Sequence, residues 1–134
     1  MAEKILLEIV TPEKQVVSET ADIVMAPGEL GEFGVLPGHV PFLCKLKVGE
    51  LRYRVGGATK LIAVMGGYAE VSPSGVTILS PAAEAAGEID VMRAKAAKER
   101  AERRIAEAKD KMDFIRAQGA LQRALARLKV AENQ

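Results

Sequence analysis

The chain has 134 residues, of which 49% are hydrophobic and 28% are charged, which suits one small domain with an appended module. Nineteen basic and eighteen acidic residues leave a net charge of +1, which excludes a global basic field that would hold nucleic acid. The apolar content also excludes a chain that is disordered throughout.

The composition changes near Gly87 and divides the sequence into two modules, residues 1–86 and 87–134. All six prolines and ten of the twelve glycines lie in residues 1–86, which carry seven basic and ten acidic residues. Residues 87–134 carry twelve basic and eight acidic residues and are dominated by Ala, Arg, Lys and Glu, which are strong helix formers. We therefore predict an α+β chain, with a β module followed by a helical module.

In residues 1–86, short apolar or alternating runs recur between glycine and proline turn signals. Such spacing is typical of an antiparallel sandwich or barrel, and residues 72–75 predict a hairpin turn. The glycine-rich stretch 28–34 does not precede a helix, so we interpret it as a tight turn rather than a phosphate loop. The predicted strands are residues 5–10, 21–26, 51–55, 61–65, 68–71 and 76–79.

Apolar residues three and four positions apart predict two helices of roughly 20 residues each. Asp90 is a plausible N-cap for the first helix, and a change of phase places the break between the helices at residues 110–113. Two such helices form an antiparallel hairpin. The first stripe consists of Ala94, Ala97, Ala101, Ile105, Ala108 and Met112, and the second of Phe114, Ala117, Leu121, Ala124, Leu125 and Leu128.

The alanine stripe of the first helix buries little apolar area per turn, so it adheres weakly to its neighbours. One interpretation is a hairpin with two alternative packings. The other is a stable hairpin that Leu121, Leu125 and Leu128 hold closed, and the residues alone favour neither.

Four charged residues converge if the hairpin is antiparallel. Arg123 and Arg127 are four positions apart and share one face, while Asp90 and Arg93 begin the first helix. Converging guanidinium groups fit a polyphosphate. The alternative is a surface ion-pair network with Asp90, Glu84 and Glu88, and the residue pattern alone favours that alternative.

Candidate catalytic groups are scarce, so we expect a protein that is not an enzyme. One histidine, His39, and one cysteine, Cys44, cannot build a zinc cluster, and we expect no metal site. The lone thiol fits a reducing compartment. No apolar run reaches the roughly 20 residues of a membrane-spanning helix, and the first residues show no signal-peptide pattern, so we expect a soluble chain.

Three motifs at these spacings, together with the Ala/Arg-rich tail, resemble the epsilon subunits of bacterial F-type ATP synthase. They are GEFGVLPGH at residues 31–39, GGYAEV at 66–71 and VTIL at 76–79, and the resemblance covers essentially the whole chain. It implies a β-sandwich of about ten strands followed by a two-helix hairpin. It also implies a non-catalytic rotor subunit of the central stalk, which couples ion translocation to ATP synthesis by binding the gamma subunit and the c-ring through residues 1–86.

The same resemblance implies that residues 87–134 are regulatory. Extended helices would reach the alpha and beta subunits and inhibit ATP hydrolysis, whereas ATP would stabilise the folded hairpin. The sequence IDVMRA at 89–94 matches the ATP-binding motif of some family members completely. The residues implied for ATP are Glu84, Ile89, Asp90, Arg93, Ala94, Arg100, Arg123 and Arg127. No cofactor is required, ATP is a regulatory ligand, and a role for Mg²⁺ is left open.

For the c-ring contact, the resemblance implies Glu29, Glu32 and His39. The implied location is the cytoplasmic side of the cell inner membrane, as a peripheral subunit without membrane insertion. The alternative function is a free-standing ATP-sensing binding module, which would explain the hairpin but not the β module.

Overall fold

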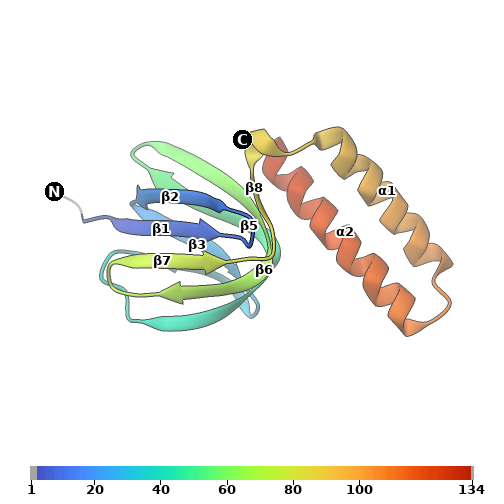
Figure 1. Cartoon of the computed structure of the whole chain (residues 1–134), viewed down its shortest axis with the longest axis horizontal. Coiled ribbons are helices and arrows are strands. Elements are labelled where there is room, and N and C mark those ends of the chain that lie inside the picture. Colours follow the sequence, from blue (N-terminus) through green and yellow to red (C-terminus); the bar gives the residue numbers. More distant parts are fainter. Residues whose placement is uncertain (1–2, 134) are drawn as a thin grey trace.

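The computed structural model describes residues 3–133, with the strands on one side and a helical hairpin on the other (Figure 1). The elements in chain order are β1 (Ile5–Val10), β2 (Gln15–Ala21), β3 (Ile23–Gly28), β4 (Gly31–Val35), β5 (Phe42–Val55), β6 (Ala58–Val71), β7 (Gly75–Leu79), β8 (Ala83–Ala85), the 3₁₀ turn η1 (Ala86–Glu88), α1 (Val91–Glu107) and α2 (Lys111–Glu132).

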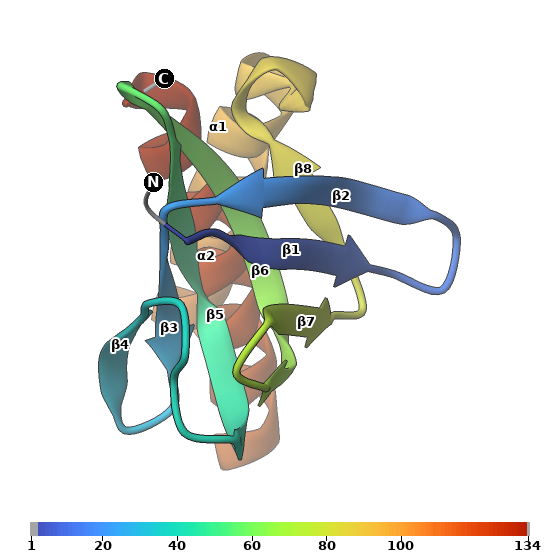
Figure 2. The same cartoon turned by 90° about the vertical axis from the view of Figure 1, so that its left-hand side faces the viewer.

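The strands are hydrogen-bonded in the order β2-β1-β7-β6-β5-β3-β4, and β8 pairs with β6. All pairs are antiparallel except β1 with β7, which run parallel. In Figure 2, β1, β2 and β7 form a layer in front of the long strands β5 and β6, and the helices lie behind. The predicted β-sandwich followed by a helical hairpin is confirmed, with eight strands in the described residues where about ten were expected.

One long strand replaces two of the strands predicted from the sequence runs. Residues 58–71 form one strand, β6, where the sequence predicted two strands separated by a turn at Gly66 and Gly67. These glycines adopt φ values of 81° and 110°, so they bend the strand without ending it. A Cβ atom on Gly67 would lie 1.9 Å from the carbonyl oxygen of Leu79, and only glycine allows β7 to approach β6 this closely.

Two further predictions for the β module have different outcomes. The turn at residues 72–75 is confirmed, because the Ser72 amide donates to the Gly75 carbonyl at 2.9 Å. The tight turn expected in residues 28–34 is present but shorter, since residues 29 and 30 join β3 to β4, Gly31 has a positive φ of 138°, and the rest of the stretch is β4. The sequence reading also missed β2, because a charged residue, Glu19, stands at the half-buried position between Val17 and Ala21.

The sandwich encloses one apolar core, which gives the β module its own stability. Its fully buried side chains include Ile5, Leu7 and Ile9 of β1, where every second residue faces inward. Ile78 of the neighbouring strand β7 and Leu51 of β5 belong to the same core. The core therefore forms without any contribution from the helices.

The two helices begin at capping aspartates. The Asp90 carboxylate accepts a hydrogen bond from the Arg93 amide at 3.0 Å, and Asp110 accepts one from the Asp113 amide at 2.8 Å. The break between the helices lies at residues 108–110, slightly before its predicted place. The predicted N-cap Asp90 is confirmed, and the two helices have 17 and 22 residues.

The seam between the helices is built from small residues. The buried residues of α1 are Ala94 and Ala101, and α1 packs almost entirely on α2. The expected leucine closure of the hairpin is only partly present. Leu128 is buried, but the Leu125 side chain is 38% exposed and borders a pocket with Val48 and Gly49 of β5.

The C-terminal part of α2 attaches the hairpin to the outer face of the sandwich. Val130 and Ala131 pack on Leu61 and Met65 of β6, and Ile89 joins the same apolar cluster. This cluster is separate from the core of the sandwich. The attachment holds the first turns of α1 beside the edge of the β module and so defines the space between the two modules.

Candidate functional site

A cleft of about 850 Å³ lies between the sandwich and the hairpin. Its walls come from four places in the chain: the turn between β1 and β2, the segment around β8, the start of α1, and the last turns of α2. The volume is within the usual range for small-molecule sites. The charged residues that line the cleft are Glu13, Lys14, Glu84, Glu88, Asp90, Arg93, Arg100 and Arg127.

The start of α1 supplies two arginines to this cleft. Arg93 and Arg100 are seven positions apart, which is close to two helical turns, so they lie along one face with Ala94 and Ala97 between them. Within residues 3–133, neither arginine forms an ion pair. Asp90 uses its carboxylate to cap the helix and fixes the orientation of this turn. The small alanines leave room for a guest between the two guanidinium groups.

Arg127 reaches the same cleft from α2. Its Nε atom donates to Oε1 of Glu84, which is on β8, and both side chains are about one-third exposed. This ion pair is a contact of the kind expected if the charged residues form only a surface ion-pair network. The same guanidinium still has its terminal nitrogens to offer, so the pair is also compatible with an anionic guest.

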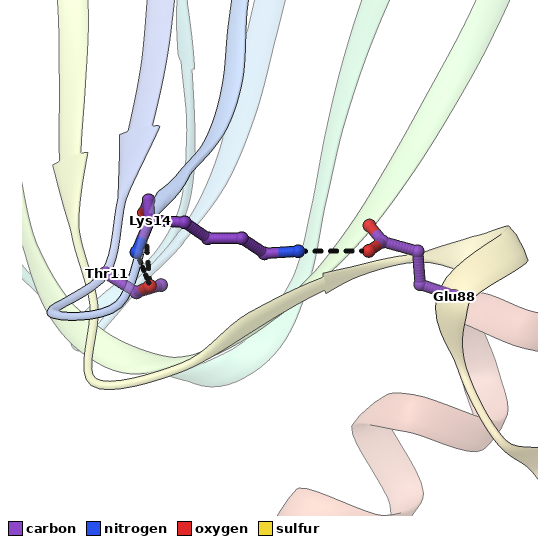
Figure 3. Close-up of polar contacts among 3 residues, drawn as sticks. All are labelled: Thr11, Lys14 and Glu88. Carbon is purple, nitrogen blue, oxygen red and sulfur yellow. Dashed lines mark hydrogen bonds and ion pairs between the residues drawn. The ribbon is translucent and has the colours of Figure 1, made fainter.

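A second ion pair crosses the rim of the cleft. The Nζ atom of Lys14, in the turn between β1 and β2, lies 3.2 Å from Oε2 of Glu88 in η1 (Figure 3). The sequence analysis did not single out Lys14. No local signal could have found it, because its partner is 74 positions away along the chain.

Two of the residues predicted for ATP do not line the cleft. Ile89 is buried in the apolar cluster beneath it, where it anchors the start of the hairpin. Arg123 is exposed on α2 outside the cleft lining. The geometry therefore brings together Glu84, Asp90, Arg93, Ala94, Arg100 and Arg127 from the predicted set.

The electrostatics of the cleft suit a charged and polar guest. Four lysine or arginine side chains and four carboxylates line the cleft, so its lining is close to electrically balanced. Two of the four basic side chains form ion pairs, Arg127 with Glu84 and Lys14 with Glu88. A polyphosphate could replace these carboxylates, because its oxygens match the guanidinium geometry and carry more charge.

The three residues predicted for the c-ring lie elsewhere, around β4 and the loop that follows it. Glu32 accepts a hydrogen bond from Arg52 at 2.7 Å, and Glu29 lies 3.9 Å from Lys45. The Nδ1 atom of His39 lies 2.8 Å from the carbonyl oxygen of Val40. Exposed apolar side chains accompany these residues in the same segments, namely Leu30, Leu36, Val40 and Leu43.

Two features are absent from residues 3–133. No group of three or more His, Cys, Asp or Glu side chains is arranged to hold a metal ion. No helix in the described part of the chain is long and apolar enough to cross a membrane.

A β-sandwich with a C-terminal helical hairpin and a charged cleft between them defines a two-module protein with a site at the junction of its modules. Residues 4–86 match the family described as "ATP synthase, Delta/Epsilon chain, beta-sandwich domain". Residues 88–132 match the one described as "ATP synthase, Delta/Epsilon chain, long alpha-helix domain". The chain belongs to the ATP synthase delta/epsilon chain family, and the predicted relationship to epsilon subunits is confirmed.

Individual relatives agree with this assignment. The chain is 74% identical over 132 residues to the ATP synthase epsilon chain of Syntrophobacter fumaroxidans, covering 98% of both chains. It is 56% identical over 107 residues to that of Desulforapulum autotrophicum, covering 79% of both. Among solved structures, a chain of the Euglena gracilis mitochondrial ATP synthase, in an OSCP/F1/c-ring structure, superimposes with a TM-score of 0.83 at 25% identity. That match covers 99% of this chain and 84% of the other.

Proposed function

We propose that this chain is a central-stalk rotor subunit of an F-type ATP synthase whose hairpin is a regulatory element that ATP stabilises in the folded position. The residues 1–86 would bind the gamma subunit and the c-ring, and the extended hairpin would contact the alpha and beta subunits and inhibit ATP hydrolysis. The subunit itself performs no chemistry. Its place is peripheral, on the cytoplasmic side of the cell inner membrane, where it couples ion translocation to ATP synthesis.

The cleft between the two modules is the observation that supports regulation of the hairpin by ATP. Arg93 and Arg100 approach it from α1 and Arg127 from α2, while Glu84 belongs to the sandwich. A nucleotide in this cleft would contact both modules at once. It would bind only while the hairpin is docked, because undocking separates the walls.

Because ATP would bind only the docked hairpin, the ATP concentration would control how much of the hairpin is docked. A ligand at about one hundred times its Kd stabilises the state that binds it by about 2.7 kcal/mol. The hairpin is attached by one small apolar cluster around Val130 and Met65, so a stabilisation of this size matters. High ATP would therefore keep the hairpin folded and the motor free of inhibition.

The c-ring contact is supported by the exposed acidic residues Glu29 and Glu32 and by the apolar side chains beside them. Acidic groups at the rim of such a surface would meet basic residues of a c-subunit loop and fix the orientation of the contact. Reconstitution with gamma and the c-ring tests it. Failure of the chain to co-purify with gamma would favour the alternative of a free-standing ATP-sensing module.

The ATP site is tested by calorimetric titration of ATP into the isolated chain. We expect binding that disappears in the Arg93→Ala/Arg127→Ala double variant. The matched control is Arg103→Ala/Arg116→Ala, which removes two arginines of the hairpin outside the cleft lining and should leave binding intact. Absence of heat up to millimolar ATP in the unaltered chain would overturn the ATP site and leave Arg127 as an ion-pair partner of Glu84.

A further inference from the structure

The turn between β1 and β2 forms a wall of the cleft that belongs to the sandwich. Its residue Lys14 extends across the rim toward η1, where its ammonium group meets Glu88 (Figure 3). Lys14 is the single cation that the sandwich contributes to the cleft lining within residues 3–133, since the three arginines all come from the hairpin. Lys14 is therefore placed to act on the hairpin from the other module.

The backbone of this turn is held in position before any ligand arrives. The Thr11 amide donates to the Lys14 carbonyl at 2.9 Å, and the Lys14 amide donates to the Thr11 hydroxyl at 3.3 Å. The Thr11 hydroxyl in turn donates to the Lys14 carbonyl at 3.2 Å. Pro12 restricts the turn further, because its ring fixes φ. Only the side chain of Lys14 has to move when its partner changes.

The present partner of Lys14 is easily exchanged. The Lys14 and Glu88 side chains are 58% and 50% exposed, and ion pairs at such positions are weak because water screens them. A polyphosphate chain offers a higher charge and several acceptor oxygens at one place, and lysine is a common phosphate ligand. The ammonium group would therefore leave Glu88 for a polyphosphate in the cleft.

We propose that Lys14 is a phosphate-binding residue of the nucleotide site, paired with Glu88 while the cleft is empty and with the polyphosphate when it is filled. The inference rests on the proposed ATP site and adds to it a contact from the sandwich. A nucleotide held by Lys14 on one side and by Arg93 and Arg127 on the other ties the hairpin to the sandwich directly. Glu88, released from Lys14, turns into solvent, where it is already half exposed.

A double-mutant cycle separates this role from a purely structural one. ATP affinity is measured by calorimetry for the unaltered chain, Lys14→Gln, Glu88→Gln and the double variant. We expect Lys14→Gln to weaken binding roughly fivefold, both in the unaltered chain and in the Glu88→Gln background. Glu88→Gln alone should bind ATP as tightly as the unaltered chain or more tightly, because it removes a competitor for Lys14.

Two further variants control for charge and for folding. Lys45→Gln removes a lysine of nearly the same exposure, 59%, which faces Glu29 and lies outside the cleft lining, and it should leave the affinity unchanged. Lys14→Arg keeps the positive charge and should retain most of the affinity. Circular dichroism of each variant verifies that the sandwich is folded.

Each contrary outcome has a distinct meaning. Full affinity in Lys14→Gln overturns the inference while the ATP site stands. A loss that vanishes in the Glu88→Gln background also overturns it, because Lys14 would then act only by holding Glu88. An equal loss in Lys45→Gln would reduce the effect to overall charge. If the unaltered chain binds no ATP, the proposed site and the inference fall together.

Discussion

The Nε atom of Arg127 on α2 donates to Oε1 of Glu84 on β8, which joins the end of the hairpin to a strand 43 positions earlier in the chain. β8 is itself paired with β6, so the contact reaches the sandwich through one short strand. The Arg127–Glu84 pair and the Lys14–Glu88 pair are two polar contacts at the cleft that hold the docked hairpin to the sandwich. These attachments are polar and partly exposed, so a charged ligand or a change of solvent can exchange them.

The strength of the Arg127 attachment is measurable by a double-mutant cycle of Glu84→Ala and Arg127→Met. We expect a coupling of about 1 kcal/mol or less in the free energy of unfolding, since both side chains are about one-third exposed and water screens the pair. Chemical denaturation of the four proteins supplies the numbers. Lys129→Ala, an exposed change on the same helix, is the control. A coupling of zero would show that the pair does not hold the hairpin.

The apolar attachment is tested by Val130→Ala. Val130 is fully buried against β6, and deletion of its two outer methyl groups should cost about 2 kcal/mol of docking free energy. Because the core of the sandwich does not include Val130, hydrogen exchange should rise in the helices and stay unchanged in the strands. Leu125→Ala, at a partly exposed position of the same helix, should have a much smaller effect. Equal destabilisation of both modules would contradict the separation of the two apolar clusters.

The close approach of β7 to β6 depends on Gly67. We expect Gly67→Ala to destabilise the fold by more than about 3 kcal/mol, because its Cβ would overlap the Leu79 carbonyl and its φ is 110°. Gly57→Ala is the matched control, since a Cβ there meets nothing within 4 Å and the φ of Gly57 is not positive. Thermal unfolding followed by circular dichroism measures both. A Gly67→Ala variant as stable as Gly57→Ala would show that β7 can move away at little cost.

Local patterns predicted the elements that depend on neighbouring residues. The alternation of residues 5–10, the turn at 72–75 and the capping aspartate Asp90 all follow from interactions within a few positions. The same reasoning misjudged Gly66 and Gly67. Glycine in a strand and glycine in a turn look alike in sequence, and only the distant strand β7 decides between them.

The residues of the candidate site that lie on the two helices were predictable from the sequence. The face shared by Arg93 and Ala94 follows from helix periodicity, and the antiparallel hairpin brings Arg127 near them. The contribution of the sandwich was not predictable, because Lys14 reaches the cleft through tertiary contacts alone. Arg123 was expected beside Arg127, yet the cleft meets α2 only at Arg127, and Arg123, one turn earlier on the same face, lies outside the lining.

The pH limits of the fold depend on one buried tyrosine and its partner. Tyr53 is 4% exposed, and its hydroxyl donates to Glu19 Oε2 at 2.9 Å. Burial, followed by the Glu19 carboxylate, raises the pKa of Tyr53 well above its ordinary value of 10.0. The hydrogen bond from Lys60, followed by that from Tyr53, lowers the pKa of Glu19 below its ordinary value of 4.5.

The signs of these shifts set a window of stability. The Glu19 contribution is complete above pH 4.5 and is lost as the pH falls through its lowered pKa. The Tyr53 contribution is complete below pH 10.0 and is lost as the pH rises toward its raised pKa. In a Tyr68→Phe variant, the chain has one tyrosine and no tryptophan, so phenolate absorbance reports Tyr53 alone.

We expect this phenolate absorbance to rise together with the loss of β-sheet circular dichroism, and not before it, because the folded chain holds Tyr53 in its neutral form. Adding Glu19→Gln removes the carboxylate but keeps an acceptor oxygen. The phenolate should then form at lower pH, although burial still raises the pKa of Tyr53 above its ordinary value. A phenolate signal near pH 10 with the sheet intact would contradict this, since it would show that water reaches Tyr53 in the folded sandwich.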